Sequence, residues 1–177
     1  QAVTRGEPLP ALHGVPISIK DTIDTAGIRT VAGTRLRETF VPEADAPVVA
    51  RLKQAGAILL GKTNVPECAM DYRCENPVFG RTSNPWNLER VPGGSSGGEA
   101  AAIAAGCSVA GVGSDLGGSI RVPAHFCGIT GLKPTLGRIP GCGHFPPGVG
   151  PFALGASLGP MARRVEDLAL LLGVLAG

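Results

Sequence analysis

Short segments that either alternate apolar with other residues or are apolar throughout follow one another along this chain, and three of them predict β-strands. Residues 14–20 alternate apolar with other side chains, and Pro16 fits the start of a strand or an edge strand. Residues 57–60 are a short apolar run that predicts a buried strand, and residues 109–113 are a second one. Residues 75–94 hold three prolines and several turn formers, which predict a long irregular loop.

Other segments have the patterns of helices. Residues 46–55 are interpreted as a helix with Asp45 as its N-cap. Ser96–Glu99 has the spacing of a capping box before the alanine-rich residues 100–105. Residues 163–176 place leucines on one face, as an amphipathic helix does. Strands and helices therefore alternate, which predicts an α/β fold with a sheet covered by helices.

Length and composition narrow the class of protein. A chain of 177 residues, 44% of them hydrophobic, predicts one domain over residues 1–177 with a substantial core. The net charge of +2, the lack of a basic run and an aromatic content of 4% argue against nucleic acid as a direct partner. No apolar run is long enough to span a membrane and no signal peptide opens the chain, so a membrane partner is not expected.

The cysteines and histidines do not have the spacing of metal ligands. The five cysteines include no C-x-x-C pair and fit neither a zinc site nor a disulfide framework. This pattern favours a reducing, cytoplasmic location. The three histidines are interpreted as ordinary polar or core residues, so we expect no metal and no other cofactor.

Two glycine-rich stretches that contain serine are the strongest chemical signal. They are residues 93–98, Gly-Gly-Ser-Ser-Gly-Gly, and residues 117–121, Gly-Gly-Ser-Ile-Arg. Glycine permits positive φ and close approach to the main chain, and successive N–H groups that point one way bind an anion. A serine in such a loop is placed to attack a carbonyl while the backbone stabilises the oxyanion. The two loops together indicate acyl transfer.

Two other motifs match known strings in their letters. Residues 56–63 fit the Walker A string, but its four middle residues are the predicted strand, which argues against a phosphate-binding loop. The G-x-S-x-G string of α/β-hydrolases occurs around Ser96, with Asp115 and then His125 or His144 in the order of a triad. The residues before this string are a poor strand, and Ser96 is better explained as a helix cap. The histidine triad stays open as an alternative.

Six blocks of sequence carry a resemblance to a known family: residues 14–21, 61–67, 84–87, 92–99, 113–121 and 131–135, with residues 159–163 extending them. In this order they resemble the amidase signature family over nearly the whole chain. No single block is specific, but the set is. The resemblance implies an α/β/α sandwich around a mixed, mostly parallel, twisted sheet. It also implies hydrolysis of the carboxylic amide bond of a small-molecule substrate.

The resemblance further implies which residues act. The family uses a Ser–Ser–Lys triad whose middle serine follows a cis peptide bond, and these positions correspond to Ser119, Ser95 and Lys20. Ser119 is then the nucleophile, Ser95 relays the proton and a neutral Lys20 is the base. The oxyanion is bound by backbone N–H groups of the second glycine loop, those of Leu116, Gly117, Gly118 and Ser119. Taken alone, the lysine would be interpreted as a solvated surface residue.

Neighbouring residues are expected to support the site. Asp115 and Arg121 are expected to hold the second glycine loop as a buried pair, because such loops need rigid support. Ser96 is expected to cap the following helix, and Cys127 is interpreted as a small core residue.

Family members are much longer than this chain, with a helical region before residue 14 and a large part after residue 159. We therefore expect an incomplete substrate pocket and exposed core faces that favour a homo-oligomer. Two other functions stay open. One is the glutaminase subunit of a tRNA-dependent amidotransferase, which releases ammonia from glutamine for a partner protein. The other is an inactive fragment that acts as a binding module.

Overall fold

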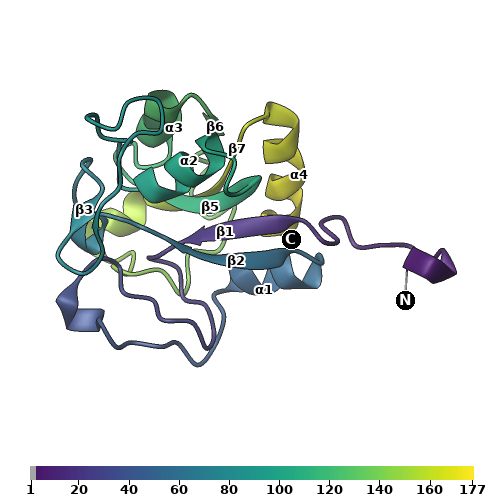
Figure 1. Ribbon diagram of the computed structural model, residues 1–177. Coiled ribbons are helices and arrows are strands. Elements are labelled where there is room, and N and C mark those ends of the chain that lie inside the picture. Colours follow the sequence, from purple (N-terminus) through teal and green to yellow (C-terminus); the bar gives the residue numbers. More distant parts are fainter. Residues whose placement is uncertain (1–2) are drawn as a thin grey trace.

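Within residues 3–177, which the computed structural model describes, a five-stranded mixed sheet is covered on both faces by four α-helices (Figure 1). The strand order is β2-β1-β5-β7-β6. β1 is parallel to β2 and β5, whereas β7 is antiparallel to β5 and to β6. Four of the five strands therefore run in one direction. The prediction of a mixed, mostly parallel α/β/α sandwich is confirmed.

The strands of this sheet are β1 (Pro16–Lys20), β2 (Ile58–Thr63), β5 (Ala110–Asp115), β6 (Thr130–Gly131) and β7 (Ser157–Ala162). The helices are α1 (Pro47–Gln54), α2 (Gly97–Ala104), α3 (Arg121–Cys127) and α4 (Val165–Ala176). β3 (Glu75–Asn76) and β4 (Gly80–Arg81) form a separate two-stranded ribbon within the predicted loop. Short 3₁₀ helices are η1 (Val3–Arg5), η2 (Arg35–Arg37), η3 (Glu67–Ala69) and η4 (Gly150–Leu154).

The alternation along β1 divides its side chains between the core and the site. Ile17 and Ile19 point to one face of the sheet, where they join a buried cluster with side chains of α1 and α4. Ser18 and Lys20 point to the opposite face, where α2 begins. The two polar residues are nevertheless buried, because α2 and α3 cover that face (Figure 1). A strand with one apolar face therefore delivers a lysine into the interior.

β2 differs from its prediction as a buried strand. It lies at the edge of the sheet, and the side chains of Ile58 and Leu60 are 55% and 51% exposed. An apolar run cannot by itself distinguish an edge strand from a central one. The strand continues through Lys62 to Thr63, so the Walker A string lies in a strand rather than in a loop followed by a helix.

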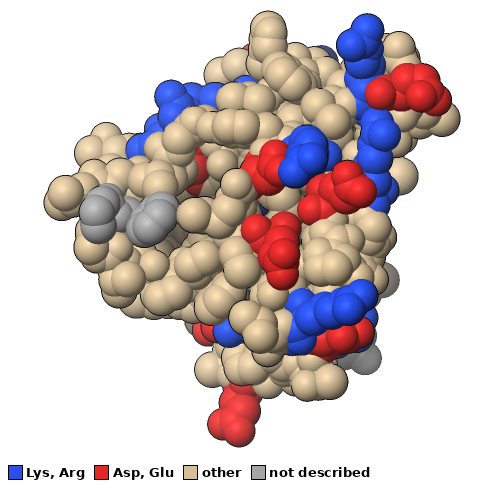
Figure 2. All heavy atoms as spheres, turned by 90° about the vertical axis from the view of Figure 1, so that its left-hand side faces the viewer, with Lys and Arg blue, Asp and Glu red and all other residues tan. Residues whose placement is uncertain are grey.

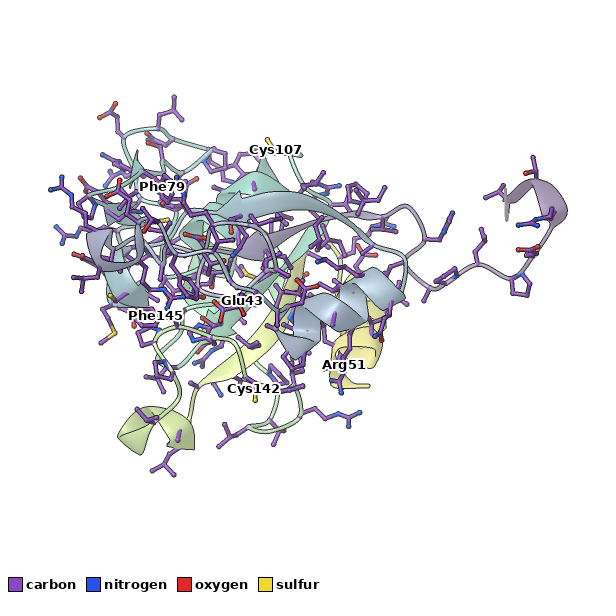
Figure 3. The ribbon with its side chains drawn as sticks, turned by 90° about the horizontal axis from the view of Figure 1, so that it is seen from below. Glu43, Arg51, Phe79, Cys107, Cys142 and Phe145 are labelled. Atoms are coloured by element: carbon purple, nitrogen blue, oxygen red, sulfur yellow. The ribbon has the colours of Figure 1, made fainter. Side chains whose placement is uncertain are left out.

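The N-cap predicted for α1 is wrong. Ala46 occupies the N-cap position and Pro47 is the first helical residue. The Asp45 carboxylate instead accepts hydrogen bonds from the backbone N–H of Ala26 and from Nζ of Lys53. Arg51, also on α1, donates to the carbonyl of Leu175 and so ties α1 to the end of α4 (Figure 3).

No helix within residues 3–177 combines the length and apolar character that crossing a bilayer requires.

Candidate active site

A cavity of about 250 Å³ opens where β5 ends, beside the two glycine loops. Its polar lining comes from Ser95, Ser114, Asp115, Ser119 and His144, and most other lining residues are apolar. Figure 2 shows this end of the molecule, where most charged side chains gather over the centre and right of the view and a separate group of Lys or Arg side chains lies at the upper left. The carboxyl ends of parallel strands are the usual position of ligand sites in α/β proteins.

Lys20 is the last residue of β1, and its side chain is fully buried. Its Nζ lies 2.7 Å from Oγ of Ser95 and 2.9 Å from Oγ of Ser114. The carbonyl oxygen of Ser114 lies 3.3 Å from the same nitrogen. Three acceptors therefore surround the amine, which matches the three hydrogens of an ammonium group.

Burial lowers the pKa of Lys20 to about 7, because a poorly solvated site disfavours the charged amine. Cys74, Asp115 and Glu99 lie close enough to raise this pKa in part. At neutral pH about half of the amine is consequently neutral. A neutral amine next to a serine hydroxyl has the properties of a general base.

Ser95 follows two glycines whose backbones are tightly surrounded. The Gly94–Ser95 peptide bond is cis. Gly93 has φ near 80°, and a Cβ on this residue would lie 2.9 Å from Cα of Pro123. A Cβ on Gly94 would lie 2.5 Å from the carbonyl oxygen of Asp71. These contacts explain the need for glycine, and they hold Ser95 in place beside the buried amine.

Asp115 holds the second glycine loop. Its carboxylate accepts hydrogen bonds from the backbone N–H groups of Gly118, Ile120 and Arg121, at 2.8, 3.0 and 3.2 Å. The guanidinium of Arg121 donates two more. Burial raises the pKa of Asp115, but the hydrogen bonds from Arg121 and the backbone outweigh it and lower the value to about 2. The pair is buried only on the Asp115 side, because the side chain of Arg121 is 56% exposed.

The loop leaves several backbone donors free. The N–H groups of Leu116, Gly117 and Ser119 have no acceptor within residues 3–177. The N–H of Gly118, the fourth donor expected for an oxyanion, is already bonded to Asp115. Three of the four expected donors are therefore available to a bound anion.

We expect Asp115→Asn to disorder this loop, because an amide offers one acceptor oxygen where the carboxylate offers two. The free energy of unfolding should fall by about 2–4 kcal/mol at pH 7, measured by urea denaturation. The folded-state pKa is depressed, so the contribution of the carboxylate is complete above its ordinary pKa and is lost as pH falls through about 2. Asp71→Asn is the control, because Asp71 pairs with Arg73 at the surface. Equal unfolding curves for both variants would contradict this role for Asp115.

Ser96 occupies the N-cap position of α2 as predicted, but the side-chain hydrogen bonds of the predicted capping box with Glu99 are not formed. The Ser96 hydroxyl donates to the Ser114 carbonyl at 3.2 Å and accepts from the Ser114 N–H at 3.3 Å, so it supports the end of β5. Glu99 accepts hydrogen bonds from Ser18 and Thr63. Its burial raises its pKa to about 7. The sheet supplies better donors for Glu99 than the first turn of α2 does.

The alternative histidine triad is not assembled. His125 is an exposed residue on α3. Nε2 of His144 lies 2.9 Å from Oγ of Ser114 and not against Ser96. Asp115 is bonded to Arg121 and to the backbone rather than to a histidine. The order Ser–Asp–His in the sequence therefore has no counterpart in space.

Ser114 is a site residue that sequence reasoning missed, and His144 was considered only as a member of the alternative histidine triad. Ser114 directly precedes Asp115 at the end of β5, and this position could have indicated a role at the site. His144 lies in a Gly/Pro-rich loop without periodicity, so no local pattern places it.

Cys127 is a buried core residue as predicted, and burial raises its pKa to about 11. Among the described residues, no group of three or more His, Cys, Asp or Glu side chains could hold a metal ion.

Comparison with known proteins identifies relatives over the whole chain. The profile of the Amidase family matches residues 1–177. The A subunit of the glutamyl-tRNA(Gln) amidotransferase of Prochlorococcus marinus (strain MIT 9303) is 54% identical over 180 residues, which cover 100% of this chain and 36% of the relative. The chain thus spans little more than a third of the length of this curated relative.

Solved structures agree with this assignment. One of them is the inhibitor-bound form of a vestigial protein complex that reveals the evolutionary origins of an s-triazine catabolic enzyme. Its TM-score is 0.93 and its sequence identity is 46%, over 99% of this chain and 38% of that one. Native peptide amidase from Stenotrophomonas maltophilia has a TM-score of 0.87 and 36% identity, over 99% of this chain and 36% of that one. The family profile, the sequence relatives and the fold all lead to one conclusion: the chain belongs to the Amidase family.

Proposed function

We propose that this protein hydrolyses carboxylic amide bonds through an acyl-enzyme on Ser119. The observation that carries the proposal is the buried contact of 2.7 Å between Nζ of Lys20 and Oγ of Ser95, which lines the same cavity as Ser119. The lowered pKa of Lys20 supports it, because it gives the amine a large neutral fraction at pH 7.

The proposed steps pass a proton along these three side chains. Neutral Lys20 takes the proton of Ser95, which takes the proton of Ser119, and Oγ of Ser119 attacks the amide carbonyl carbon. The free N–H groups of the second glycine loop stabilise the oxyanion, each by roughly 3 kcal/mol. Ser95 then returns a proton to the leaving amine, and water hydrolyses the acyl-enzyme. Hydrolysis of simple aliphatic and aryl amides, followed by chromatography of both products, tests the proposal.

A second candidate is glutaminase activity in an amidotransferase. It is favoured by the 54% identity to the A subunit of a glutamyl-tRNA(Gln) amidotransferase. Glutamine assayed beside simple amides separates the two candidates by which substrate releases ammonia faster. A protein that is neither acylated nor turns over any amide would instead be a binding module.

The setting of this activity is also part of the proposal. We propose a single catalytic core over residues 1–177, since one sheet carries both apolar clusters. The half-exposed Ile58 and Leu60 of edge strand β2 support self-association, which light scattering would test.

All five cysteines are free, which supports a reducing, cytoplasmic location. A small-molecule amide is the proposed ligand, with no direct contact to nucleic acid and none to a membrane.

We expect the activity to need neither a metal nor a thiol. Cys68 lines the cavity, but burial raises its pKa, so the reactive thiolate is scarce at neutral pH. Cys68→Ser should keep kcat within about twofold of wild type, because its hydroxyl fills nearly the same space. Dialysis against a chelator should leave the rate unchanged. A tenfold loss in either measurement, with the fold intact by circular dichroism, would count against the serine scheme.

A further inference from the structure

His144 is anchored over the site by the loop that carries it. The residue makes an antiparallel bridge with Ile23, just beyond β1. Its neighbour Phe145, labelled in Figure 3, donates its backbone N–H to the Thr22 carbonyl at 2.8 Å. The guanidinium of Arg37 lies 4.3 Å from the centre of the Phe145 ring. These contacts fix the imidazole in the cavity on the side of Ser114.

The hydrogen bonds of His144 determine its tautomer. Nδ1 lies 2.9 Å from the carbonyl oxygen of Pro146, which can only accept, so Nδ1 carries the hydrogen. Burial lowers the pKa of His144 to about 4, and the nearby Lys20 acts in the same direction, so the ring is neutral at pH 7. Nε2 is therefore unprotonated. At 2.9 Å from Oγ of Ser114, it accepts the hydrogen of that hydroxyl.

This assignment fixes the direction of the next hydrogen bond. The Ser114 hydroxyl has one hydrogen, and His144 receives it. Toward Lys20, 2.9 Å away, the same oxygen can then only accept. The Ser114 carbonyl, at 3.3 Å, is a second acceptor. A neutral amine has two hydrogens and one lone pair, so both hydrogens are directed to Ser114 and the lone pair faces Ser95.

We propose that His144 is a positioning residue that, through Ser114, directs the lone pair of neutral Lys20 toward Ser95. The inference rests on the proposed amide hydrolysis. It also explains how the proton can move without rearrangement: after transfer, the ammonium keeps its bonds to Ser114 and donates its new hydrogen to Ser95. Without His144 as acceptor, the Ser114 hydroxyl is free to donate to the lone pair of Lys20 and thereby compete with Ser95.

Two substitutions at His144 test the proposal. His144→Leu removes the acceptor and should lower kcat and the rate of acylation by a fluorophosphonate by roughly tenfold. His144→Gln offers a side-chain oxygen to the Ser114 hydroxyl and should recover most of this loss. Equal losses in both variants, with equal thermal stability, would overturn the proposal.

A double-mutant cycle locates the effect. In a Ser114→Ala background, no hydroxyl is left to be oriented, so His144→Leu should cause no further loss in kcat. Losses that multiply would show that His144 acts on the substrate or on the fold instead, and would overturn the proposal.

One measurement is independent of activity. In wild-type protein, ¹⁵N NMR of the His144 ring should show a protonated Nδ1 and an unprotonated Nε2 at pH 7. The opposite tautomer would overturn the hydrogen-bond direction even in an active enzyme. A protein that is never acylated but has the expected tautomer would instead contradict the proposed function and leave the orienting contact in place.

Discussion

Ser119→Ala is expected to abolish amide hydrolysis and the labelling of the protein by fluorophosphonates. The substitution removes the only atom that the proposed scheme bonds to the acyl group. The residual rate should lie about 10⁵- to 10⁶-fold below wild type, as in other enzymes that lose a serine nucleophile. Single-turnover kinetics and intact-protein mass spectrometry measure the two effects.

The fold should tolerate this change, so the loss would be chemical. Ser108→Ala is the control at a serine away from the cavity, because Ser108 is buried before β5, where its hydroxyl donates to the Ala110 carbonyl. It should be labelled at the wild-type rate. Ser95→Ala should label slowly but on Ser119, because it loses the proposed relay and keeps the proposed nucleophile. A label on Ser95 or Ser96 in the Ser119→Ala protein would assign the nucleophile elsewhere.

The sequence was sufficient for the parts of the fold that depend on local pattern. The alternation in residues 14–20 and the leucine stripe in residues 163–176 predicted β1 and α4 because each pattern reports one buried face. The position of β2 at the edge of the sheet was not predictable, since it depends on which strands pair. The cap of α1 failed for a similar reason: Asp45 finds stronger donors in Ala26 and Lys53 than in the first turn.

The candidate site, like the fold, could be predicted from the sequence only where a local pattern marks it. The glycine loops indicated acyl transfer from the sequence alone, because a serine flanked by glycines combines a nucleophile with an accessible row of backbone N–H groups. Lys20 became a candidate only through the resemblance to a family, since a strand-end lysine is ordinarily solvated. The contact from His144 through Ser114 to Lys20 spans residues far apart in the chain and leaves no spacing to detect.

Lys20→Met is the second substitution with a large expected effect. It removes the proposed base and fills the same space without a charge. Because the members of a proton relay act as a unit, kcat/KM should fall roughly 10⁴-fold at pH 8. In the wild type, kcat/KM should rise with pH through an apparent pKa of about 7 and then level off, as the buried amine loses its proton. The residual activity of Lys20→Met should lack this dependence.

The buried amine of Lys20 should also make the free energy of unfolding depend on pH. Its folded-state pKa of about 7 lies below the value of 10.5 for an unfolded chain, so the unfolded state binds more protons between these values. The free energy of unfolding should therefore rise with pH from about 7 to 10.5. Urea denaturation at several pH values should show a shallower rise in Lys20→Met than in the wild type. The same slope in both proteins would contradict a depressed pKa for Lys20.

Lys62→Met is the control that shows whether the pH dependence of kcat/KM comes from Lys20 or from any buried lysine. Lys62 is also largely buried, and burial lowers its pKa, but its Nζ bonds to the Ile23 carbonyl and Thr30 and pairs with Asp21 at 3.4 Å. The substitution leaves that carboxylate without its partner, so stability should fall while the pH profile of kcat/KM keeps its apparent pKa. If Lys62→Met instead lost the pH-dependent limb and Lys20→Met kept it, the base would lie on β2, and Ser95 would have no role as its relay.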